Sequence, residues 1–536
     1  MDNKNKYEVL KTYFGYDSFR AGQESLIDAL LERKDVFGIM PTGAGKSLCY
    51  QIPALMFSGI TLVISPLISL MKDQVAALNQ AGVYAAYLNS SLTQGQYFKA
   101  LEFAKTGKYK IIYVAPERLL TESFLSFALN ANISFISVDE VHCVSQWGQD
   151  FRPSYLKIVE FISKLPKRPV VGAFTATATK EVRDDVMRIL KLKDPKMVTT
   201  GFDRTNLSFY VKRTKDKKTE LTKILREHYD ETGIIYCITR KLVEEVYDML
   251  EEKGLEVSKY HAGLSDEERQ RNQDEFIYDR TRIMVATNAF GMGIDKPDVR
   301  YVIHYNMPKN MESYYQEAGR AGRDGEAASC YMLYSAQDVH TNRFFIENNR
   351  ENEELKPDEL EAVMEKDQER LKLMTFYCHT RDCLRKYMLN YFGERAESFC
   401  GNCGNCIKKQ EVTAYQNDVE MYRRVDVQRY PMINKPASAI RAVSENPKLY
   451  DELRLLRNSL AKKMQVPAYV IFTDKTLKEM SMYLPTDREQ LLAISGVGVA
   501  KYDKFGMEFL EVIRKYKSTQ GDNHKQPKAR AKIKLN

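Results

Sequence analysis

The sequence predicts an α/β protein with two parallel β-sheets, followed by a helical metal-binding module and a small all-helical bundle. Short apolar runs alternate with helical patterns over roughly the first 340 residues. Five cysteines then crowd around residue 400, and a helical pattern without strands returns at residue 449. At 536 residues, the chain is long enough for about three or four domains.

The first sheet is predicted over residues 1–204. Strands that are covered by helices on both faces read as continuous apolar runs, and βαβ units alternate such runs with helices. The runs are "DVFGIM" (35–40), "GITLVISP" (59–66), "KIIYVAP" (110–116), "ISFISVDE" (133–140) and "PVVGAFTAT" (169–177).

A second sheet is predicted over residues 205–340 on the same grounds, although the two series share no sequence repeat. Its runs are "GIIYCIT" (233–239), "VSKYHAG" (257–263), "RIMVATNAF" (282–290), "VRYVIHYN" (299–306) and "ASCYMLYS" (328–335). Beyond them strand patterns stop, and four further segments are expected. These are a helical zinc-binding module (341–410), a linker (411–448), a helical bundle (449–515) and a disordered basic tail (516–536).

Composition narrows the class of protein. The chain is 44% hydrophobic and 28% charged, and its longest apolar run is shorter than the roughly 18 residues of a membrane span. The N-terminal "MDNKNKYEVL" has no secretory apolar region, so we expect a cytoplasmic protein with no membrane partner. A net charge of +8 is compatible with nucleic acid as a partner.

"MPTGAGKS" (40–47) predicts a phosphate-binding loop, because it lies between a predicted strand and a predicted helix. Its glycines let backbone N–H groups face an anion at a helix N-terminus. Lys46 is expected to reach the β- and γ-phosphates of a nucleotide, and Ser47 to ligate Mg²⁺. Met40 stands where the strict pattern has glycine, so a glycine-rich turn is the alternative. The loop also contributes Thr42, Gly43, Ala44 and Gly45.

An acidic pair ends the run "ISFISVDE". Asp139 is expected to hold Mg²⁺ through water, and Glu140 to orient or deprotonate the attacking water. The alternative is two solvated carboxylates at the end of a strand. Because the pair follows a phosphate loop in the expected order, we prefer the catalytic interpretation.

The second sheet supplies arginines in "QEAGRAGRDG" (316–325). Arg320 and Arg323 lie three residues apart and share one face of a helix. Arginines from a second domain can stabilise the charge that develops on a γ-phosphate, as an arginine finger does. Gln316 is expected to contact the nucleotide. Ordinary surface charge is the alternative for this segment.

Four cysteines predict a metal site. Cys383 is followed by sixteen residues and then by "CGNCGNC", which contains Cys400, Cys403 and Cys406. Four thiolates suit structural zinc, although the spacing alone leaves an iron–sulfur cluster open. The remaining cysteines are read as core or non-ligand residues, together with His379: Cys49, Cys143, Cys237, Cys330 and Cys378.

The ordered motifs "MPTGAGKS", "SPLISLMKDQV", "DEVH", "TATAT", "VATNAFGMGIDKPDVR" and "QEAGRAGR" resemble superfamily-two helicases, and "DEVHCVSQWGQDFRPSY" resembles the RecQ family of DNA helicases. The resemblance is close over residues 1–410. Residues 449–515 more loosely resemble the helicase-and-RNase-D C-terminal (HRDC) domain. The resemblance to the RecQ family implies two tandem RecA-like domains followed by a zinc module. It also implies an ATP- and Mg²⁺-dependent 3′-to-5′ DNA helicase that acts in repair and recombination.

The resemblance also implies roles for residues outside the phosphate site. Tyr16 would stack on adenine, Gln23 would hydrogen-bond its edge and Arg20 would assist. Trp147 and Phe151 would stack on bases of single-stranded DNA while Arg152 meets phosphate, although Trp147 packed beneath its own loop is the alternative. Lys72 and Arg118 would contact the DNA backbone, and Gly293 and Asp295 would sense nucleotide and strand together. Zinc at the four cysteines is part of the same resemblance.

The chain departs from the family after the metal site. Only about forty residues separate Cys406 from the bundle, which is too short for a complete winged-helix domain, so residues 411–448 are either a linker or a reduced winged-helix remnant. A DNA-stimulated translocase or annealing factor is therefore a second reading. A noncatalytic adaptor is a third, against which the intact Lys46, Glu140 and Arg323 argue. In the bundle, Gly496 and Gly498 could meet a phosphate or form an interhelical turn.

The expected partners are single-stranded DNA and tailed or branched duplex DNA. A single-strand-binding protein or a topoisomerase is the expected protein partner. The chain is expected to be a monomer in the cytoplasm of a bacterial cell, associated with the nucleoid.

Overall fold

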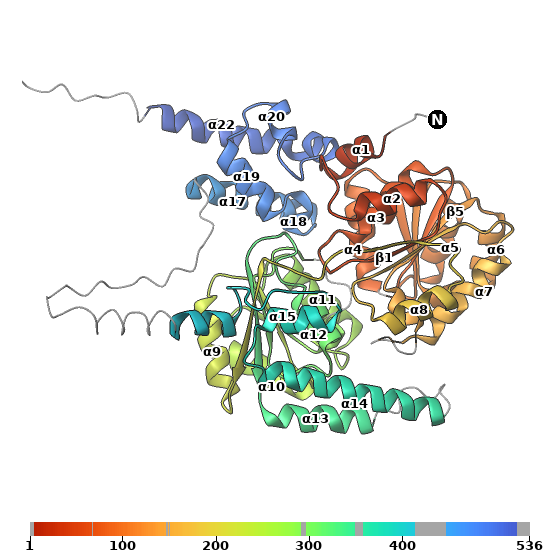
Figure 1. The fold of residues 1–536 in the computed structure, drawn as a ribbon. Helices are drawn as coiled ribbons and strands as arrows, with labels where there is room; N and C mark the ends of the chain where they lie inside the picture. Colours follow the sequence, from red (N-terminus) through yellow and green to blue (C-terminus); the bar gives the residue numbers. More distant parts are fainter. Residues whose placement is uncertain are drawn as a thin grey trace, which may run out of the picture. The chain divides into compact units, whose positions relative to one another are not determined.

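The computed structural model describes residues 5–66, 68–145, 148, 151–290, 296–348, 357–412 and 446–522. These residues form two compact units (Figure 1). The larger unit contains both sheets and the metal module, from Phe19 onward. The smaller unit joins Tyr7–Ser18 to the C-terminal bundle.

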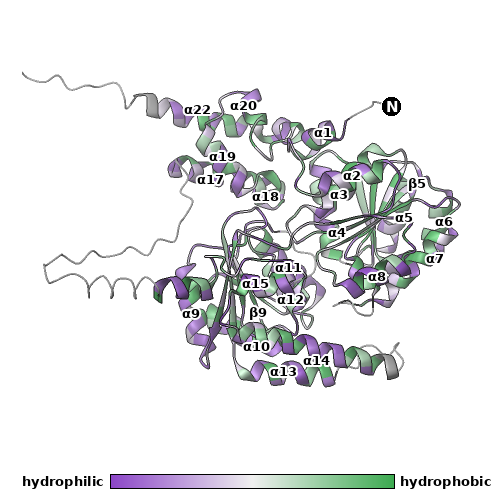
Figure 2. Ribbon diagram, in the orientation of Figure 1, coloured by the Kyte–Doolittle hydropathy of each residue, from purple (hydrophilic) through white to green (hydrophobic). Residues whose placement is uncertain are grey.

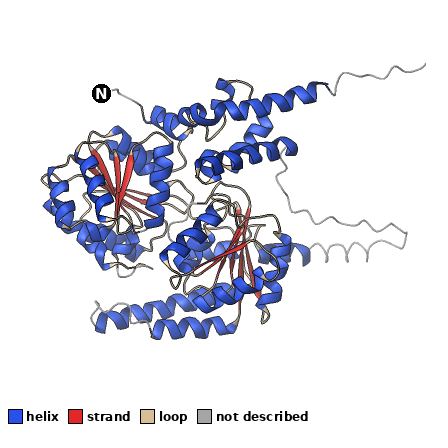
Figure 3. Cartoon of the chain, turned by 180° about the vertical axis from the view of Figure 1, so that it is seen from behind, coloured by secondary structure: helices blue, strands red, loops and turns tan. Residues whose placement is uncertain are grey.

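The first sheet has seven parallel strands in the order β3-β4-β2-β5-β6-β1-β7. Its central strands are buried along their whole length, and helices cover both faces (Figure 3). The strands are β1 (Val36–Ile39), β2 (Ile60–Ile64), β3 (Ala85–Leu88), β4 (Ile111–Val114), β5 (Ile133–Val138), β6 (Val170–Thr175) and β7 (Lys196–Thr199). The helices are α2 (Gln23–Leu31), α3 (Lys46–Met56), α4 (Ile68–Gln80), α5 (Gln94–Lys105), α6 (Glu122–Asn130), α7 (Lys157–Lys164) and α8 (Lys180–Ile189).

The second sheet has six parallel strands in the order β10-β11-β9-β12-β13-β8. The strands are β8 (Leu207–Arg213), β9 (Gly233–Tyr236), β10 (Val257–Tyr260), β11 (Ile283–Ala286), β12 (Tyr301–His304) and β13 (Ala328–Tyr334). The helices are α9 (Lys217–Glu227), α10 (Arg240–Glu251), α11 (Asp266–Ile277) and α12 (Met311–Ala318). The two parallel sheets confirm the predicted fold class.

The metal module follows the second sheet as α13 (Ala336–Glu347), α14 (Pro357–His379), α15 (Leu384–Tyr391) and a helix over 404–412. Its short helix α15 packs on β8. The apolar residues of both sheets lie inside their helical layers, while hydrophilic residues dominate the outer helix faces (Figure 2).

The smaller unit is helical. Its bundle comprises α17 (Pro447–Met464), α18 (Ala468–Ile471), α19 (Asp474–Tyr483), α20 (Arg488–Leu492), α21 (Val499–Lys501) and α22 (Met507–Asp522), around its own apolar core. The N-terminal segment adds most of α1 (Lys6–Val9) and the π-helical turn η1 (Leu10–Phe14), which packs against α21.

Several elements differ from the sequence-based expectation. The sequence assigned residues 7–18 to the first domain, whereas their contacts group them with the C-terminal bundle. Strands β3, β7 and β8 were not anticipated. Helix α22 continues to Asp522, so the beginning of the tail that was expected to be disordered is helical. Most of the 411–448 linker lies outside the described residues. Among the described residues, no helix is both long and apolar enough to cross a membrane.

Candidate nucleotide site and metal centre

The phosphate loop is built by the strand-to-helix turn between β1 and α3. The Met40 N–H donates to the Thr175 carbonyl (2.9 Å), which continues the hydrogen-bonded pairing of β1 with β6 by one residue. Gly43 and Gly45 both have a φ of +81°, a conformation that side chains other than glycine rarely adopt. Gly45 directly precedes Lys46, the first residue of α3. The loop therefore has the backbone form that exposes N–H groups at a helix N-terminus.

The acidic pair follows β5, whose neighbours in the sheet are β2 and β6. Asp139 is 5% exposed. Burial, and then the charge of Glu140, raises the pKa of Asp139 to about 6. A buried carboxylate and an adjacent half-buried one beside a phosphate loop suit a divalent cation, because carboxylate oxygens are hard ligands.

Glu140 is held next to Lys46. Its Oε1 lies 3.4 Å from Lys46 Nζ, and its Oε2 lies 3.3 Å from His142 Nδ1. Burial opposes the charged carboxylate, but the positive charge of Lys46 overcomes it and lowers the pKa of Glu140. Glu140 also has a φ of +45°, an uncommon conformation outside glycine that turns the chain sharply after the strand. Glu140 is thus ionised and aimed at the phosphate loop.

A chain of polar contacts leads from the acidic pair to the second sheet. His142 Nδ1 lies 2.8 Å from Thr175 Oγ1, which donates to the Thr177 carbonyl (3.0 Å). Gln316 of α12 in turn donates to Thr177 Oγ1 (3.5 Å). The side chains that join the two sheets therefore begin at Glu140, beside Lys46, and end at Gln316.

The arginine segment follows α12 as a series of turns, so the expectation that Arg320 and Arg323 share one face of a helix is wrong. Arg320 is 7% exposed, burial lowers the pKa of its guanidinium, and Glu140 is among the groups whose charge acts on it. Within the described chain, Arg320 Nε is buried without a hydrogen-bond partner. The segment also contacts the phosphate loop directly, since Thr42 Oγ1 donates to the Gly319 carbonyl (3.2 Å). A buried guanidinium with an unused donor is suited to an incoming anion.

Two residues expected at adenine hold the phosphate loop in this structure. Gln23 is 1% exposed and donates through Nε2 to the Ala44 and Gly45 carbonyls (both 3.0 Å). Arg20 donates to the Gly43 carbonyl (2.5 Å), and its N–H donates to Gln23 Oε1 (2.8 Å). Both residues are thus coupled to the loop backbone.

Sequence reasoning missed one residue of this site, Arg204. It lies in the connection between β7 and β8 and donates to the Thr42 carbonyl (2.6 Å). The other half of its fork reaches the Ala321 and Gly322 carbonyls (3.0 and 2.7 Å). A single arginine in a connecting segment carries no spacing signal, so sequence reasoning had no basis for selecting it.

The predicted DNA contacts are only partly described. Trp147, Gly293 and Asp295 lie outside the described residues. Arg152 is half-buried and donates to the Pro66 carbonyl (3.2 Å), and Phe151 is half-buried. The remaining two candidates are also half-buried: Lys72 in α4, and Arg118, whose guanidinium lies 5.1 Å from the Tyr97 ring centroid.

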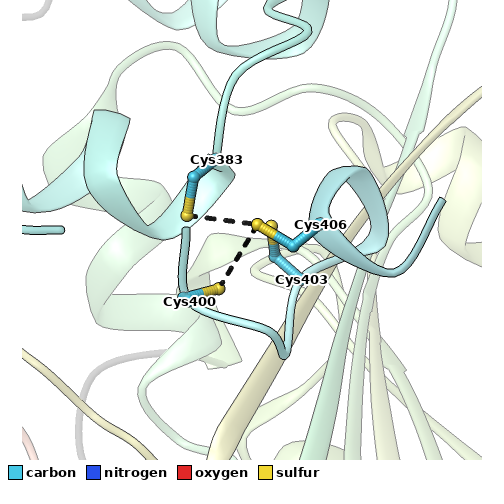
Figure 4. Close-up of side chains that lie close together, drawn as sticks. All are labelled: Cys383, Cys400, Cys403 and Cys406. Carbon is cyan, nitrogen blue, oxygen red and sulfur yellow. Dashed lines mark hydrogen bonds between the residues drawn. The ribbon is translucent and has the colours of Figure 1, made fainter. Parts of the chain in front are cut away.

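The metal centre brings together the four predicted cysteines (Figure 4). Cys383, Cys400, Cys403 and Cys406 place their sulfur atoms within 4.8 Å of one another, and Cys400–Cys406 and Cys403–Cys383 are each 4.0 Å apart. Sulfurs about 2.3 Å from a tetrahedral zinc lie about 3.8 Å apart, so the cluster fits zinc. A disulfide would need about 2.05 Å.

Backbone amides and the wider module support this cluster. The Lys386 N–H points to Cys383 Sγ at 3.5 Å, and the Asn402 N–H to Cys400 Sγ at 3.4 Å. Such contacts stabilise thiolate ligands. Cys378 is buried outside the cluster, and His379 contacts the Tyr334 hydroxyl (2.8 Å), as expected of non-ligands.

Gly496 and Gly498 of the bundle contact the N-terminal segment. The Gly496 N–H donates to the Gly15 carbonyl (3.2 Å), and Lys11 Nζ donates to the Leu492 carbonyl (2.9 Å). A Cβ atom at Gly15 would lie 2.6 Å from the Gly498 nitrogen. Close backbone approach therefore explains these glycines, and the structure favours a structural turn over a phosphate site. Tyr16 directly follows this contact.

Four family models match the chain. They are a DEAD/DEAH box helicase (20–185), a helicase conserved C-terminal domain (216–325), RecQ zinc-binding (336–407) and an HRDC domain (446–513). Together they cover the two sheets, the metal module and the bundle.

Relatives match over nearly the whole chain. The ATP-dependent DNA helicase RecQ of Bacillus subtilis is 39% identical over 588 aligned residues, which cover 95% of this chain and 98% of the relative. The protein of the same name from Haemophilus influenzae is 34% identical and covers 95% and 96%. Among solved structures, Saccharomyces cerevisiae Dbp5 bound to RNA and ADP BeF3 matches with a TM-score of 0.52 at 19% identity, over 68% of this chain and 96% of that one. The structural likeness shows the fold alone.

Proposed function

This chain belongs to the RecQ family, as its motifs predicted, and on that premise we propose that it is an ATP-dependent DNA helicase that moves 3′ to 5′ along single strands. It separates duplex or branched DNA in repair and recombination. ATP and Mg²⁺ drive the activity, and Zn²⁺ holds the metal module together. The observation that carries this proposal is the contact chain from Lys46 through Glu140 and Thr177 to Gln316, because it couples a phosphate loop to a second sheet.

The first sheet performs the chemistry in this proposal. Lys46 contacts the β- and γ-phosphates, and Ser47 and Asp139 hold Mg²⁺, with Asp139 acting through water. Mg²⁺ bound with ATP supplies positive charge to the phosphate oxygens. Glu140 orients the attacking water and accepts its proton, a role supported by its ionised state beside Lys46 and His142.

The second sheet completes the site. Arg320 and Arg323 stabilise the charge that develops on the transferred phosphoryl group. The buried, unused Nε donor of Arg320 supports this role. Gln316 reports nucleotide state through Thr177, and Gly293 and Asp295 contribute from the adjoining motif. Tyr16, Arg20 and Gln23 recognise adenine, for which Gln23 exchanges its bonds to the loop carbonyls for the base.

The direction of movement gives the first test. Labelled duplexes with a 3′ or a 5′ single-stranded tail are incubated with the protein, ATP and Mg²⁺, and strand displacement is measured. We expect displacement of the 3′-tailed duplex only, and none when ATP is omitted. Equal displacement of both substrates, or displacement of the 5′-tailed one alone, contradicts the proposed polarity.

Trp147 supplies the second test. We propose that Trp147 and Phe151 stack on bases while Arg152, Lys72 and Arg118 contact phosphates. Replacing Trp147 with alanine is expected to leave hydrolysis without DNA at the wild-type rate. The stimulation by single-stranded DNA should fall about tenfold, because stacking is worth about 1–3 kcal/mol per base. ATP hydrolysis is measured over a titration of single-stranded DNA.

The control for Trp147 is Tyr229→Ala, which removes a 73% exposed aromatic side chain of the second sheet domain. This variant should retain wild-type stimulation. If Trp147→Ala also retains it, Trp147 packs beneath its own loop and does not sense DNA.

A DNA-stimulated translocase or annealing factor is the second candidate function. It is favoured by the alignment with the Bacillus subtilis relative, which extends over 588 residues and so exceeds the 536 residues of this chain. The relative therefore contains residues that have no counterpart here. ATP hydrolysis stimulated by single strands, without displacement of either tailed duplex, identifies this function.

The finer partner assignments are part of the same proposal. The protein acts as a monomer in the bacterial cytoplasm, in association with the nucleoid. A single-strand-binding protein or a topoisomerase is its protein partner.

A further inference from the structure

Arg204 occupies an unusual position in the connection between the two sheets. The connection leaves β7 at Thr199 and enters β8 at Leu207. All five N–H donors of the Arg204 guanidinium are used. They reach the carbonyls of Thr42 (2.6 Å), Gly319 (3.2 Å), Ala321 (3.0 Å) and Gly322 (2.7 Å), and Asn206 Oδ1 (3.3 Å).

None of these described partners is a carboxylate. Burial lowers the pKa of Arg204, and the positive charges of Arg323 and Arg20 act in the same direction. A desolvated cation that is satisfied only by neutral groups is a costly arrangement. The stability of the fold therefore does not explain an arginine at this position. A nearby site that binds a polyanion does explain it, because the negative charge would stabilise the guanidinium.

The carbonyls that Arg204 binds lie around the two proposed arginine fingers. Gly319 precedes Arg320, and Ala321 and Gly322 separate Arg320 from Arg323. They also lie just beyond the C-terminal end of α12, where helix carbonyls lack intrahelical partners and the dipole favours a cation. The guanidinium of Arg204 thus fixes the backbone on both sides of Arg320.

The same guanidinium also binds the phosphate loop. The loop and the arginine segment meet closely here: a Cβ atom at Gly319 would lie 2.2 Å from the Thr42 side-chain Oγ1, and one at Gly43 would lie 3.5 Å from the Arg323 Cα. Arg204 is therefore bonded at once to the loop that holds phosphate and to the segment that presents both arginines.

We propose that Arg204 is a positioning residue for ATP hydrolysis, which sets the register between the phosphate loop and the arginine segment so that Arg320 and Arg323 meet the γ-phosphate. This inference rests on the proposed ATPase function. Only arginine supplies a planar fork of five donors, and the three donors of lysine cannot replace all its bonds. A displacement of about 1 Å at a reacting centre can cost about a hundredfold in rate.

The metal module holds the other side of the connection. Arg385, in α15, forms an ion pair with Asp203 and donates to the carbonyls of Arg204 (2.8 Å) and Leu207. Glu394 accepts a hydrogen bond from the Phe202 N–H. The backbone that carries Arg204 is therefore fixed by the metal module, while the Arg204 side chain reaches into the nucleotide site.

The test compares Arg204→Ala and Arg204→Lys with the wild type in steady-state ATP hydrolysis at saturating single-stranded DNA. We expect kcat to fall about 10- to 100-fold in Arg204→Ala, with KM for ATP within about threefold. Arg204→Lys should recover part of the loss. Binding of a fluorescent nonhydrolysable ATP analogue should change little, because protein oxygens already use all five donors of Arg204.

Arg213→Ala is the matched control. Arg213 also donates to two backbone carbonyls, those of Cys378 (3.1 Å) and His379 (3.0 Å), but at the metal module. This variant should keep the wild-type kcat. An equal loss of kcat in both variants, accompanied by an equal fall in Tm, overturns the positioning role because it identifies a general loss of stability.

A double-mutant cycle with Arg320→Ala distinguishes positioning of Arg320 from a purely structural role of Arg204. The cycle compares the effect of Arg204→Ala on kcat in the presence and in the absence of the Arg320 side chain. If Arg204 acts through Arg320, then adding Arg204→Ala to Arg320→Ala lowers kcat by less than about threefold further. Fully multiplicative losses, a wild-type kcat in Arg204→Ala, or a changed KM with unchanged kcat each overturn the proposal. A wild-type protein without DNA-stimulated hydrolysis overturns the proposed function itself, and this inference with it.

Discussion

Replacing Lys46 with alanine lowers DNA-stimulated ATP hydrolysis by about 100- to 1,000-fold and abolishes strand separation. We expect this result because we propose that Lys46, the cation at the start of α3, contacts the β- and γ-phosphates. Removal of one preorganised charge at a reacting centre costs about that much. The substitution also removes a positive charge that lowers the pKa of Glu140. Phosphate release and strand displacement are measured in the same preparation.

The control for Lys46→Ala is Lys34→Ala. Lys34 is an exposed lysine of the same sheet domain, paired with the exposed Glu32 (2.9 Å). It should keep wild-type hydrolysis and displacement. Lys46→Ala should also keep the wild-type Tm within a few degrees, so that lost activity is not lost folding. Full turnover in Lys46→Ala disproves the assignment of the phosphate site.

Replacing Cys403 with serine is expected to remove zinc from the protein and to unfold the metal module. Cys403 is fully buried among the other three thiols, and zinc binding contributes directly to the folding of such sites. We expect the bound metal to fall from about one zinc per chain to nearly none, and the protein to unfold at a lower temperature. Elemental analysis and thermal unfolding measure the two effects.

Cys378→Ala is the matched control for the metal centre, since Cys378 is equally buried in the same module but lies outside the cluster. This variant should retain its zinc, with a modest loss of stability from the missing sulfur. Iron in the wild-type protein contradicts the zinc assignment. Loss of zinc from Cys378→Ala contradicts the set of ligands.

The central strands of both sheets were predictable because helices bury both of their faces. β1, β2, β4, β5 and β6 are buried at every position, and each coincides with a predicted run. The strands that sequence reasoning missed, β3, β7 and β8, all lie at sheet edges. An edge strand is covered less completely, and β7 has three exposed residues of four, so its apolar signal disappears.

The functional site divides in a similar way. Residues within a local motif, such as Lys46, the acidic pair and the four cysteines, were found because their chemistry depends on short spacings. Arg204 was missed because, apart from the nearby Asn206, its partners lie 115 residues or more away along the chain. Those distant partners are backbone carbonyls, which any residue possesses. The union of Tyr7–Ser18 with the bundle was missed for the same reason.

The contact between the N-terminal segment and the bundle, at Gly15 and Gly496, has a consequence for the order in which parts of the protein fold during synthesis. Lys11 and its partner Leu492 are separated by 481 positions. At translation speeds of about 5–20 residues per second, the N-terminal segment waits roughly half a minute or longer for the bundle that receives it. Both sheets can complete their strands during that interval. The segment that carries Tyr16 is thus among the first parts of this chain to be synthesised and among the last to reach its folded position.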